Sequence, residues 1–122
     1  PPGGVKPDFS FSCKVDKNQA ALYRLSGDLN PLHLDPAAAK RGGFDRPILH
    51  GLCTYGIATR SLVMGPLNGE VGRLKEFRAR FSSSVYPGDT LTTEGWKIDD
   101  GYIIQAKTEN NIVLSNAMAV IK

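Results

Sequence analysis

The sequence predicts a single α+β domain in which one long helix packs against an antiparallel sheet. The chain has 122 residues, 41% of them hydrophobic, which is enough material for one core. Residues 50–64 place apolar side chains at helical spacing and carry almost no charge. Most of the chain after Val71 instead alternates apolar with polar residues between turn signals, a pattern typical of antiparallel strands.

The domain proper is expected to run over residues 9–122. Residues 1–8 contain three prolines and two glycines, so we expect a flexible leader or the remnant of a linker there. Phe9, Phe11 and Cys13 then alternate with polar residues, which predicts a strand with one buried face.

Two short helices are predicted before the long one. The first covers 18–24 with Asp16 as its cap, and the second starts at Pro36 with Asp35 as its cap. Proline suits the first helical position because its missing N–H has no partner there in any case.

The long helix is predicted from about His50 to Met64, ended by Gly65 and Pro66. It has little polar face, so we expect it to be mostly enclosed. Four segments after it predict strands, with turns between them at 87–89, 99–101 and 110–111: 77–81, 90–98, 102–108 and 112–121. One enclosed helix wrapped by a curved antiparallel meander is the hot dog architecture.

Composition excludes several classes of protein. The net charge of +3 mildly favours an anionic partner, but no basic run is interleaved with aromatic residues, so nucleic acid binding is not expected. No segment approaches the ~20 apolar residues of a membrane helix. Cys13 and Cys53 have neither disulfide-scaffold nor metal-ligand spacing, so we expect reduced thiols and no metal. Phosphate-loop and nucleophile-elbow motifs are also missing.

A carboxylate and an imidazole, Asp28 and His33, lie five residues apart on one turn. Pro31 stiffens this turn, and the Asn30 side chain can hold its backbone. Such a pair can act as general acid and base on one water or substrate proton. An Asx turn followed by an ordinary surface histidine explains the same residues, and this alternative stays open.

Gly51 begins the long helix, where backbone N–H groups are unpaired and the helix dipole is positive. Its N–H would suit an oxygen that gains negative charge, since glycine lets a ligand approach closely. Alternatively, Gly51 only relieves crowding against the sheet. Arg78 and Arg80 alternate with apolar residues and form either a solvated sheet face or a contact to phosphate groups of a partner.

Two of these segments together resemble the signature of the MaoC-like (R)-specific enoyl-CoA hydratases, also called hydratase 2. They are YRLSGDLNPLH at 23–33 and GFDRPILHGL at 43–52, and the similarity resumes at 80–81 and 85–91. It covers about residues 18–119. The resemblance is closest to the C-terminal, catalytic half of the hydratase 2 region in eukaryotic peroxisomal multifunctional enzymes of type 2.

The resemblance implies reversible hydration of a trans-2-enoyl-CoA to a (3R)-3-hydroxyacyl-CoA in fatty acid β-oxidation. No cofactor is implied, because CoA belongs to the substrate. Asp28 and His33 would hold the water, deliver hydroxide to the β carbon and supply a proton to the α carbon. The Gly51 N–H would hold the thioester oxygen, and Asn30 would support the loop. Candidate substrate-binding residues are Pro47, Tyr55 and Arg80.

The resemblance also bears on partners and location. The eukaryotic members carry two hot dog repeats where this sequence holds one, so we expect a homodimer or pairing with an upstream repeat. A non-catalytic acyl-CoA-binding half and a hot dog acyl-CoA thioesterase remain alternatives. A peroxisomal location is implied by resemblance alone, because the last residues are not a Ser-Lys-Leu tail; the cytoplasm is the other expectation.

Overall fold

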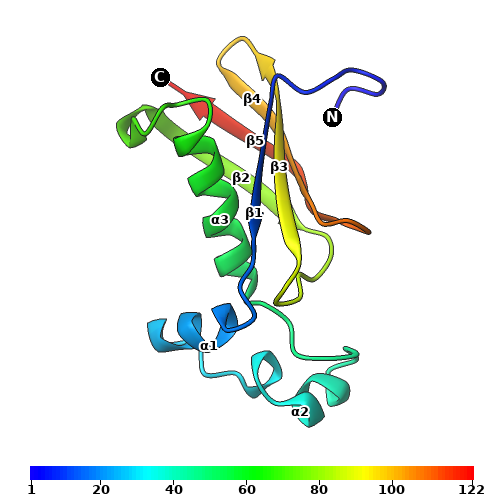
Figure 1. The fold of residues 1–122 in the computed structure, drawn as a ribbon. Coiled ribbons are helices and arrows are strands. Elements are labelled where there is room, and N and C mark those ends of the chain that lie inside the picture. The colour runs from blue at the N-terminus through cyan, green and yellow to red at the C-terminus, as the bar shows by residue number, and fades with distance from the viewer.

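The computed structural model describes residues 1–122 and places the 14-residue helix α3 (Gly51–Met64) against one face of a five-stranded antiparallel sheet (Figure 1). The predicted α+β hot dog architecture is confirmed. The strands are β1 (Phe9–Lys14), β2 (Leu74–Phe81), β3 (Thr90–Ile98), β4 (Gly101–Lys107) and β5 (Ile112–Ile121). Short elements gather beyond one end of the sheet: α1 (Gln19–Tyr23), η1 (Arg24–Ser26), η2 (Pro31–His33) and α2 (Pro36–Arg41), while η3 (Val71–Arg73) precedes β2.

The strand order is β1-β3-β4-β5-β2. The expected meander is confirmed for β3, β4 and β5, in which Trp96 lies opposite Ile103 and Ile104 opposite Ala117. It is wrong for β2, which pairs with β5 at the far edge instead of with β3. The connection over 82–89 is too long for a tight hairpin, so β2 and β3 are free to lie on opposite edges.

The core forms where α3 meets the sheet. Ala58 and Leu62 of α3 are 0% exposed, as are Leu91 and Leu114 of the strands. Burying a leucine side chain contributes roughly 1.5–3 kcal/mol, so these contacts fix the helix on the sheet. The α3 N-terminus therefore has a defined place, at the end of the sheet where the short helices gather (Figure 1).

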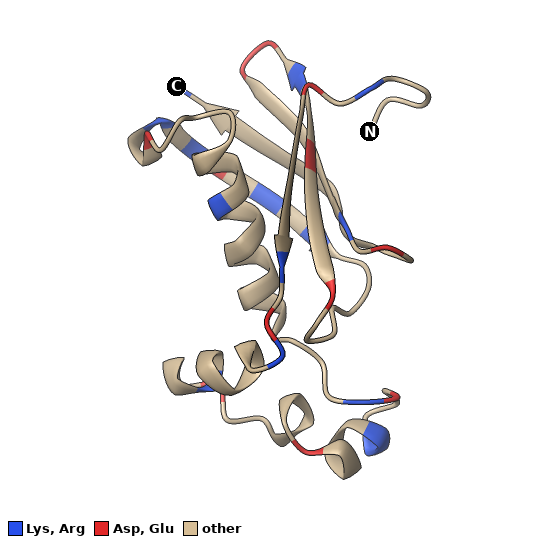
Figure 2. Ribbon diagram, viewed as in Figure 1, with Lys and Arg blue, Asp and Glu red and all other residues tan.

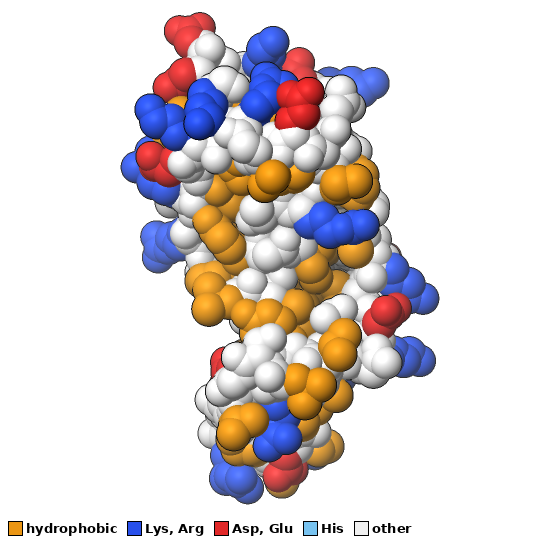
Figure 3. Space-filling view, turned by 90° about the vertical axis from the view of Figure 1, so that its left-hand side faces the viewer, with side chains coloured by type: hydrophobic (Ala, Val, Ile, Leu, Met, Phe, Trp, Pro, Cys, Tyr) orange, Lys and Arg blue, Asp and Glu red, His pale blue; other side chains and the backbone are white.

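The helix is less enclosed than its sequence predicts. Its outward face is exposed, with Leu52 at 66% and Met64 at 52% of their full exposure. The expectation of a mostly enclosed helix is wrong for the single chain, because the sheet covers only one side of it. Figure 3 shows apolar side chains gathered over this part of the molecule, and α3 itself contains a single charged residue, Arg60 (Figure 2).

The two predicted caps differ in outcome. The Asp35 carboxylate accepts a hydrogen bond from the Ala37 N–H at 2.9 Å, so that cap is confirmed. Asp16 does not cap α1 with its side chain, because the helix starts later, at Gln19, and Asp16 contributes its carbonyl oxygen to the Gln19 N–H instead.

Part of the N-terminal segment lies along the β3 edge. The Trp96 indole donates to the Val5 carbonyl at 2.8 Å, and the Lys97 N–H donates to the Asp8 carboxylate at 2.6 Å.

None of the helices combines the length and the hydrophobicity that a membrane span requires.

Candidate active site

The turn that carries Asp28 is held by its own polar side chains. Gly27 adopts a positive φ of 111°, which favours glycine, and ends η1 just before Asp28. The Asn30 N–H donates to the Asp28 carboxylate at 3.2 Å, and the Asn30 side-chain oxygen accepts from the Leu32 N–H at 3.1 Å. The Asn30 side chain thus forms an Asx turn with the Leu32 N–H, and its role in supporting an active-site loop stays a prediction.

His33 ends η2 and is not a surface histidine, since it is only 9% exposed. Its Nδ1 lies 2.8 Å from the Ile48 carbonyl oxygen. A carbonyl only accepts, so Nδ1 carries the proton and a neutral His33 presents its Nε2 lone pair on the other side of the ring. The alternative of an ordinary exposed histidine after an Asx turn is therefore wrong.

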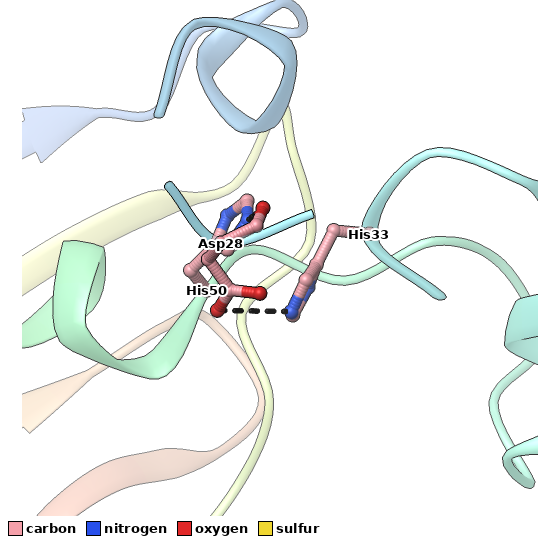
Figure 4. A group of neighbouring side chains, drawn as sticks. All are labelled: Asp28, His33 and His50. Carbon is pink, nitrogen blue, oxygen red and sulfur yellow. Dashed lines mark hydrogen bonds and ion pairs between the residues drawn. The ribbon is translucent and has the colours of Figure 1, made fainter. Parts of the chain in front are cut away.

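The Nε2 lone pair of His33 faces the half-exposed Asp28 carboxylate, 4.0 Å from Oδ2 (Figure 4). This separation is too long for a direct hydrogen bond. An ionised carboxylate and a neutral imidazole nitrogen are both acceptors, so one water molecule can donate a proton to each. The turn therefore creates a place for a single, oriented water.

Gly51 is exposed at the first position of α3, directly after the N-cap residue His50. Its N–H has no hydrogen-bond partner in the chain, as expected for the first turn of a helix. Gly51 lines a hollow of about 320 Å³ together with Thr54, Phe81, Ile48, Leu49 and residues 82–85. A donor is thus available at the wall of a ligand-sized cavity.

A second hollow, of about 310 Å³, adjoins His33. Pro47 lines it, as do the cationic residues Lys17 and Arg46. The Arg46 guanidinium also lies 4.4 Å from the centre of the Tyr86 ring. Pro47 therefore shares a hollow with His33, whereas Gly51 lines the other hollow.

The two other candidate substrate-binding residues line neither hollow. Tyr55 is half-buried, stacks on Phe77 with ring centres 4.8 Å apart and donates its hydroxyl to the Phe77 carbonyl. Arg80 is an exposed residue of β2 opposite Ser115. Their assignment to substrate binding stays a prediction.

A third side chain, that of His50, joins Asp28 and His33. The ligand atoms of these three residues lie within 4.8 Å of one another, so they are the group that could hold a metal ion. The rings of His33 and His50 are stacked, however, with centres 3.8 Å apart and planes at 26°. Nearly parallel rings direct their lone pairs side by side instead of toward one ion, which is unfavourable for coordination.

Sequence reasoning missed His50 and Phe81. His50 is 1% exposed, and its burial, followed by the nearby His33, lowers its pKa. The available signal was its position immediately before the glycine of a helix N-terminus. Phe81 lies over Gly51, its ring edge 3.3 Å from where a Cβ would stand, and no local pattern distinguishes it from an ordinary strand residue.

Comparison with known proteins follows the same segments. The family model for the MaoC like domain matches residues 2–118. A Dictyostelium discoideum protein named probable enoyl-CoA hydratase 2 is 48% identical over 120 residues, which is 95% of this chain and 41% of that protein. The mouse peroxisomal multifunctional enzyme type 2 is 47% identical over 113 residues, 91% of this chain and 15% of the mouse protein.

Solved structures agree with these matches. The full-length peroxisomal multifunctional enzyme type 2 from Drosophila melanogaster superposes with a TM-score of 0.93 at 38% identity, covering 100% of this chain and 23% of that one. A MaoC-like dehydratase from Phytophthora capsici superposes with a TM-score of 0.92 at 40% identity. The match covers 100% of this chain and 44% of the dehydratase chain. The chain thus spans less than half the length of these relatives. It belongs to the MaoC-like domain family.

Proposed function

We propose that the chain hydrates trans-2-enoyl-CoA thioesters to (3R)-3-hydroxyacyl-CoA, with Asp28 and His33 as the acid–base pair. The relatives named enoyl-CoA hydratase 2 and peroxisomal multifunctional enzyme type 2 support the substrate class. The geometry supports the residues, because two acceptor atoms 4.0 Å apart can both accept a hydrogen bond from one water beside them. The observation that carries the proposal is this 4.0 Å separation of His33 Nε2 from Asp28 Oδ2.

In this mechanism the water between Asp28 and His33 is the nucleophile. Its oxygen bonds to the β carbon while the pair accepts one of its protons. The electron pair of the double bond moves to the α carbon and the thioester oxygen, and a proton from the pair then reaches the α carbon. All atoms of the water end in the product, so the reaction requires no cofactor.

The thioester oxygen gains negative charge during this addition and needs a donor. The free N–H of Gly51 is assigned to it, supported by its exposure at the mouth of the α3 helix. One such donor is worth roughly 3 kcal/mol in the transition state. Acid–base positioning adds about 10²- to 10⁴-fold in rate.

The test is the loss of enoyl thioester absorbance with crotonyl-CoA, compared among wild type, Asp28→Asn and His33→Ala. We expect each variant to lose at least ~10²-fold in kcat with an unchanged circular dichroism spectrum. Asp45→Asn, which replaces an exposed carboxylate outside the pair, is the matched control and should retain activity. A folded Asp28→Asn or His33→Ala variant with wild-type turnover would refute the assignment.

A second hot dog unit is the proposed partner. Its support is the open face of α3, defined as Leu52, Gly56 and Met64, together with the exposed ring of Phe81 (Figure 3). The partner is either a second copy or an upstream repeat; this chain covers only 23% of the full-length Drosophila enzyme. Light scattering decides between them: we expect a dimer, and a monomer without turnover that gains activity from an added upstream half would favour the repeat.

The proposed location is the peroxisome, supported by the name of the mouse peroxisomal multifunctional enzyme type 2. Two other activities are outcomes of the same assays. Binding of the CoA ester without turnover would indicate a non-catalytic half, and release of free CoA would indicate a thioesterase.

A further inference from the structure

His50 is a buried titratable group that the proposed mechanism does not use. It is 1% exposed and lies at the N-cap of α3. Its ring stacks on His33, with centres 3.8 Å apart (Figure 4). The His50 ring also contacts Tyr23, with centres 4.8 Å apart and planes at 46°. An imidazole enclosed in this way beside two reacting groups calls for an explanation.

The surroundings of the two ring nitrogens of His50 define which of them carries the proton. Nε2 lies 3.4 Å from the Asp28 carbonyl oxygen, which only accepts, so Nε2 carries the proton. Nδ1 is buried without a partner. A neutral ring leaves only a lone pair there, whereas a charged ring would bury an unpaired N–H, and burial accordingly lowers the pKa of His50.

This contact connects Asp28 to the rest of the domain. The other hydrogen bond that Asp28 makes comes from Asn30, within the same turn. The bond from His50 is thus its one hydrogen bond to a different part of the fold. Without it, the half-exposed carboxylate would be held by the turn alone.

The residues just before α3 position both members of the pair. The Ile48 carbonyl accepts from His33, and His50 donates to Asp28 two residues later. Between them, the Leu49 N–H donates to the Val85 carbonyl at 2.7 Å, and its side chain is 2% exposed. The segment 48–50 is therefore anchored to the core and sets where Asp28 and His33 stand relative to each other.

We propose that His50 is a positioning residue: its Nε2–H tethers the Asp28 main chain to the start of α3, and its ring backs His33. Together these contacts maintain the separation of Asp28 and His33 at which both can bind one water. This inference rests on the proposed hydration. Displacing a reacting group by about 1 Å can cost ~10²-fold in rate, so a tether that touches no substrate still governs kcat.

The test compares two replacements of His50 in the crotonyl-CoA assay. His50→Phe keeps a flat ring but removes the donor, and His50→Gln restores an N–H near the position of Nε2. We expect kcat to fall about tenfold or more in His50→Phe with KM changed by less than about threefold, and His50→Gln to recover a substantial part of the loss. Wild-type kcat in His50→Phe, a purely KM effect, or equal losses in both variants would overturn the proposal.

A stability control separates positioning from folding. Trp96→Phe also removes a hydrogen bond from a buried ring, but Trp96 lies near the β3–β4 turn, at the end of the sheet away from the short helices (Figure 1). We expect it to lower the melting temperature without lowering kcat. If Trp96→Phe lowers kcat as much as His50→Phe at the same loss of stability, the role of His50 is only structural and the proposal is overturned.

Nitrogen-15 NMR of the histidine rings separates this inference from the proposed function. A neutral His50 protonated at Nε2 at pH 7 supports the tether even if the wild-type chain hydrates nothing, in which case the proposed function alone fails. A His50 protonated at Nδ1, or doubly protonated, overturns the tether even if the chain is an active hydratase.

Discussion

Replacing Gly51 with proline removes one backbone N–H from the mouth of α3 while leaving the helix able to form. Proline is favoured at the first position of a helix, where the N–H has no internal partner. The residue before a proline must be extended, and His50 already has φ −59° and ψ 135°. The substitution therefore deletes the assigned donor to the thioester oxygen and no hydrogen bond within the chain.

The expected effect is large because a developing charge is left unpaired. Loss of one such donor costs about 2.7–4 kcal/mol, or ~10²- to 10³-fold in kcat. Gly51→Ala is the matched control, since it keeps the N–H and adds the same Cβ. That Cβ would stand 3.3 Å from the Phe81 ring edge, which is half-exposed and can shift by a few tenths of an ångström.

The assay is steady-state hydration of crotonyl-CoA, with thermal melting measured on the same samples. Removing a glycine at a compatible position restricts the unfolded chain, so both variants should be as stable as wild type or gain about 0.4–1 kcal/mol. The kcat ratio of Gly51→Ala to Gly51→Pro should be at least ~10². A folded proline variant that turns over as fast as the alanine variant would show that the Gly51 N–H does not stabilise the reacting thioester.

Three further predictions concern pH, packing and metal. Burial, and then the nearby His33, lowers the pKa of His50 in the folded protein below its ordinary value of 6.5, although Asp28 opposes this shift. The unfolded chain therefore binds more protons, so the melting temperature should fall as pH drops below 6.5, and should fall less in His50→Gln. The same pH dependence of the melting temperature in both proteins would contradict this prediction. Gly101→Ala should lower the free energy of unfolding, measured by urea titration, by roughly 1–3 kcal/mol or more, since its Cβ would overlap the Ala119 carbonyl, whereas Gly72→Ala, with open space around it, should not; equal free energies of unfolding would refute the steric argument. Dialysis against EDTA should leave hydration unchanged, and loss of activity that zinc restores would assign the Asp28, His33 and His50 group to a metal.

Much of the fold could be predicted because local pattern and tertiary structure agree. The alternation in 90–98 and 112–121 and the turn at 99–101 identify strands that pair as expected, since a short turn leaves two adjacent strands little choice. The position of β2 could not be predicted in this way. Its partner depends on the path of a long connection, which carries no periodic signal.

The exposure of α3 was mispredicted for a related reason. An almost uncharged helix is typical of a buried helix. Its sequence does not show whether its own sheet or another molecule buries it. Leu52 and Met64 are as apolar as the buried Leu62, and only the structure separates them.

The proximity of Asp28 and His33 was predictable because a rigid turn brings the two residues together locally, within five residues. The supports of the pair are long-range contacts. His50 stacks on His33 and bonds to Asp28 across 22 residues, and Phe81 reaches Gly51 from β2. No spacing rule links such residues, so they emerge only when the sheet sets α3 against the short helices.

The most direct test of the central claim is the fate of the water oxygen. Crotonyl-CoA should be incubated with the wild-type chain in water enriched in oxygen-18, and the products should be separated by chiral chromatography and mass spectrometry. If Asp28 and His33 hold the water that adds to the double bond, the product is the (3R)-3-hydroxy thioester with one heavy oxygen at carbon 3, and Asp28→Asn forms it at least ~10²-fold more slowly. Heavy oxygen in a free carboxylate, a (3S) product, or label that enters carbon 3 in Asp28→Asn at the wild-type rate would contradict the account.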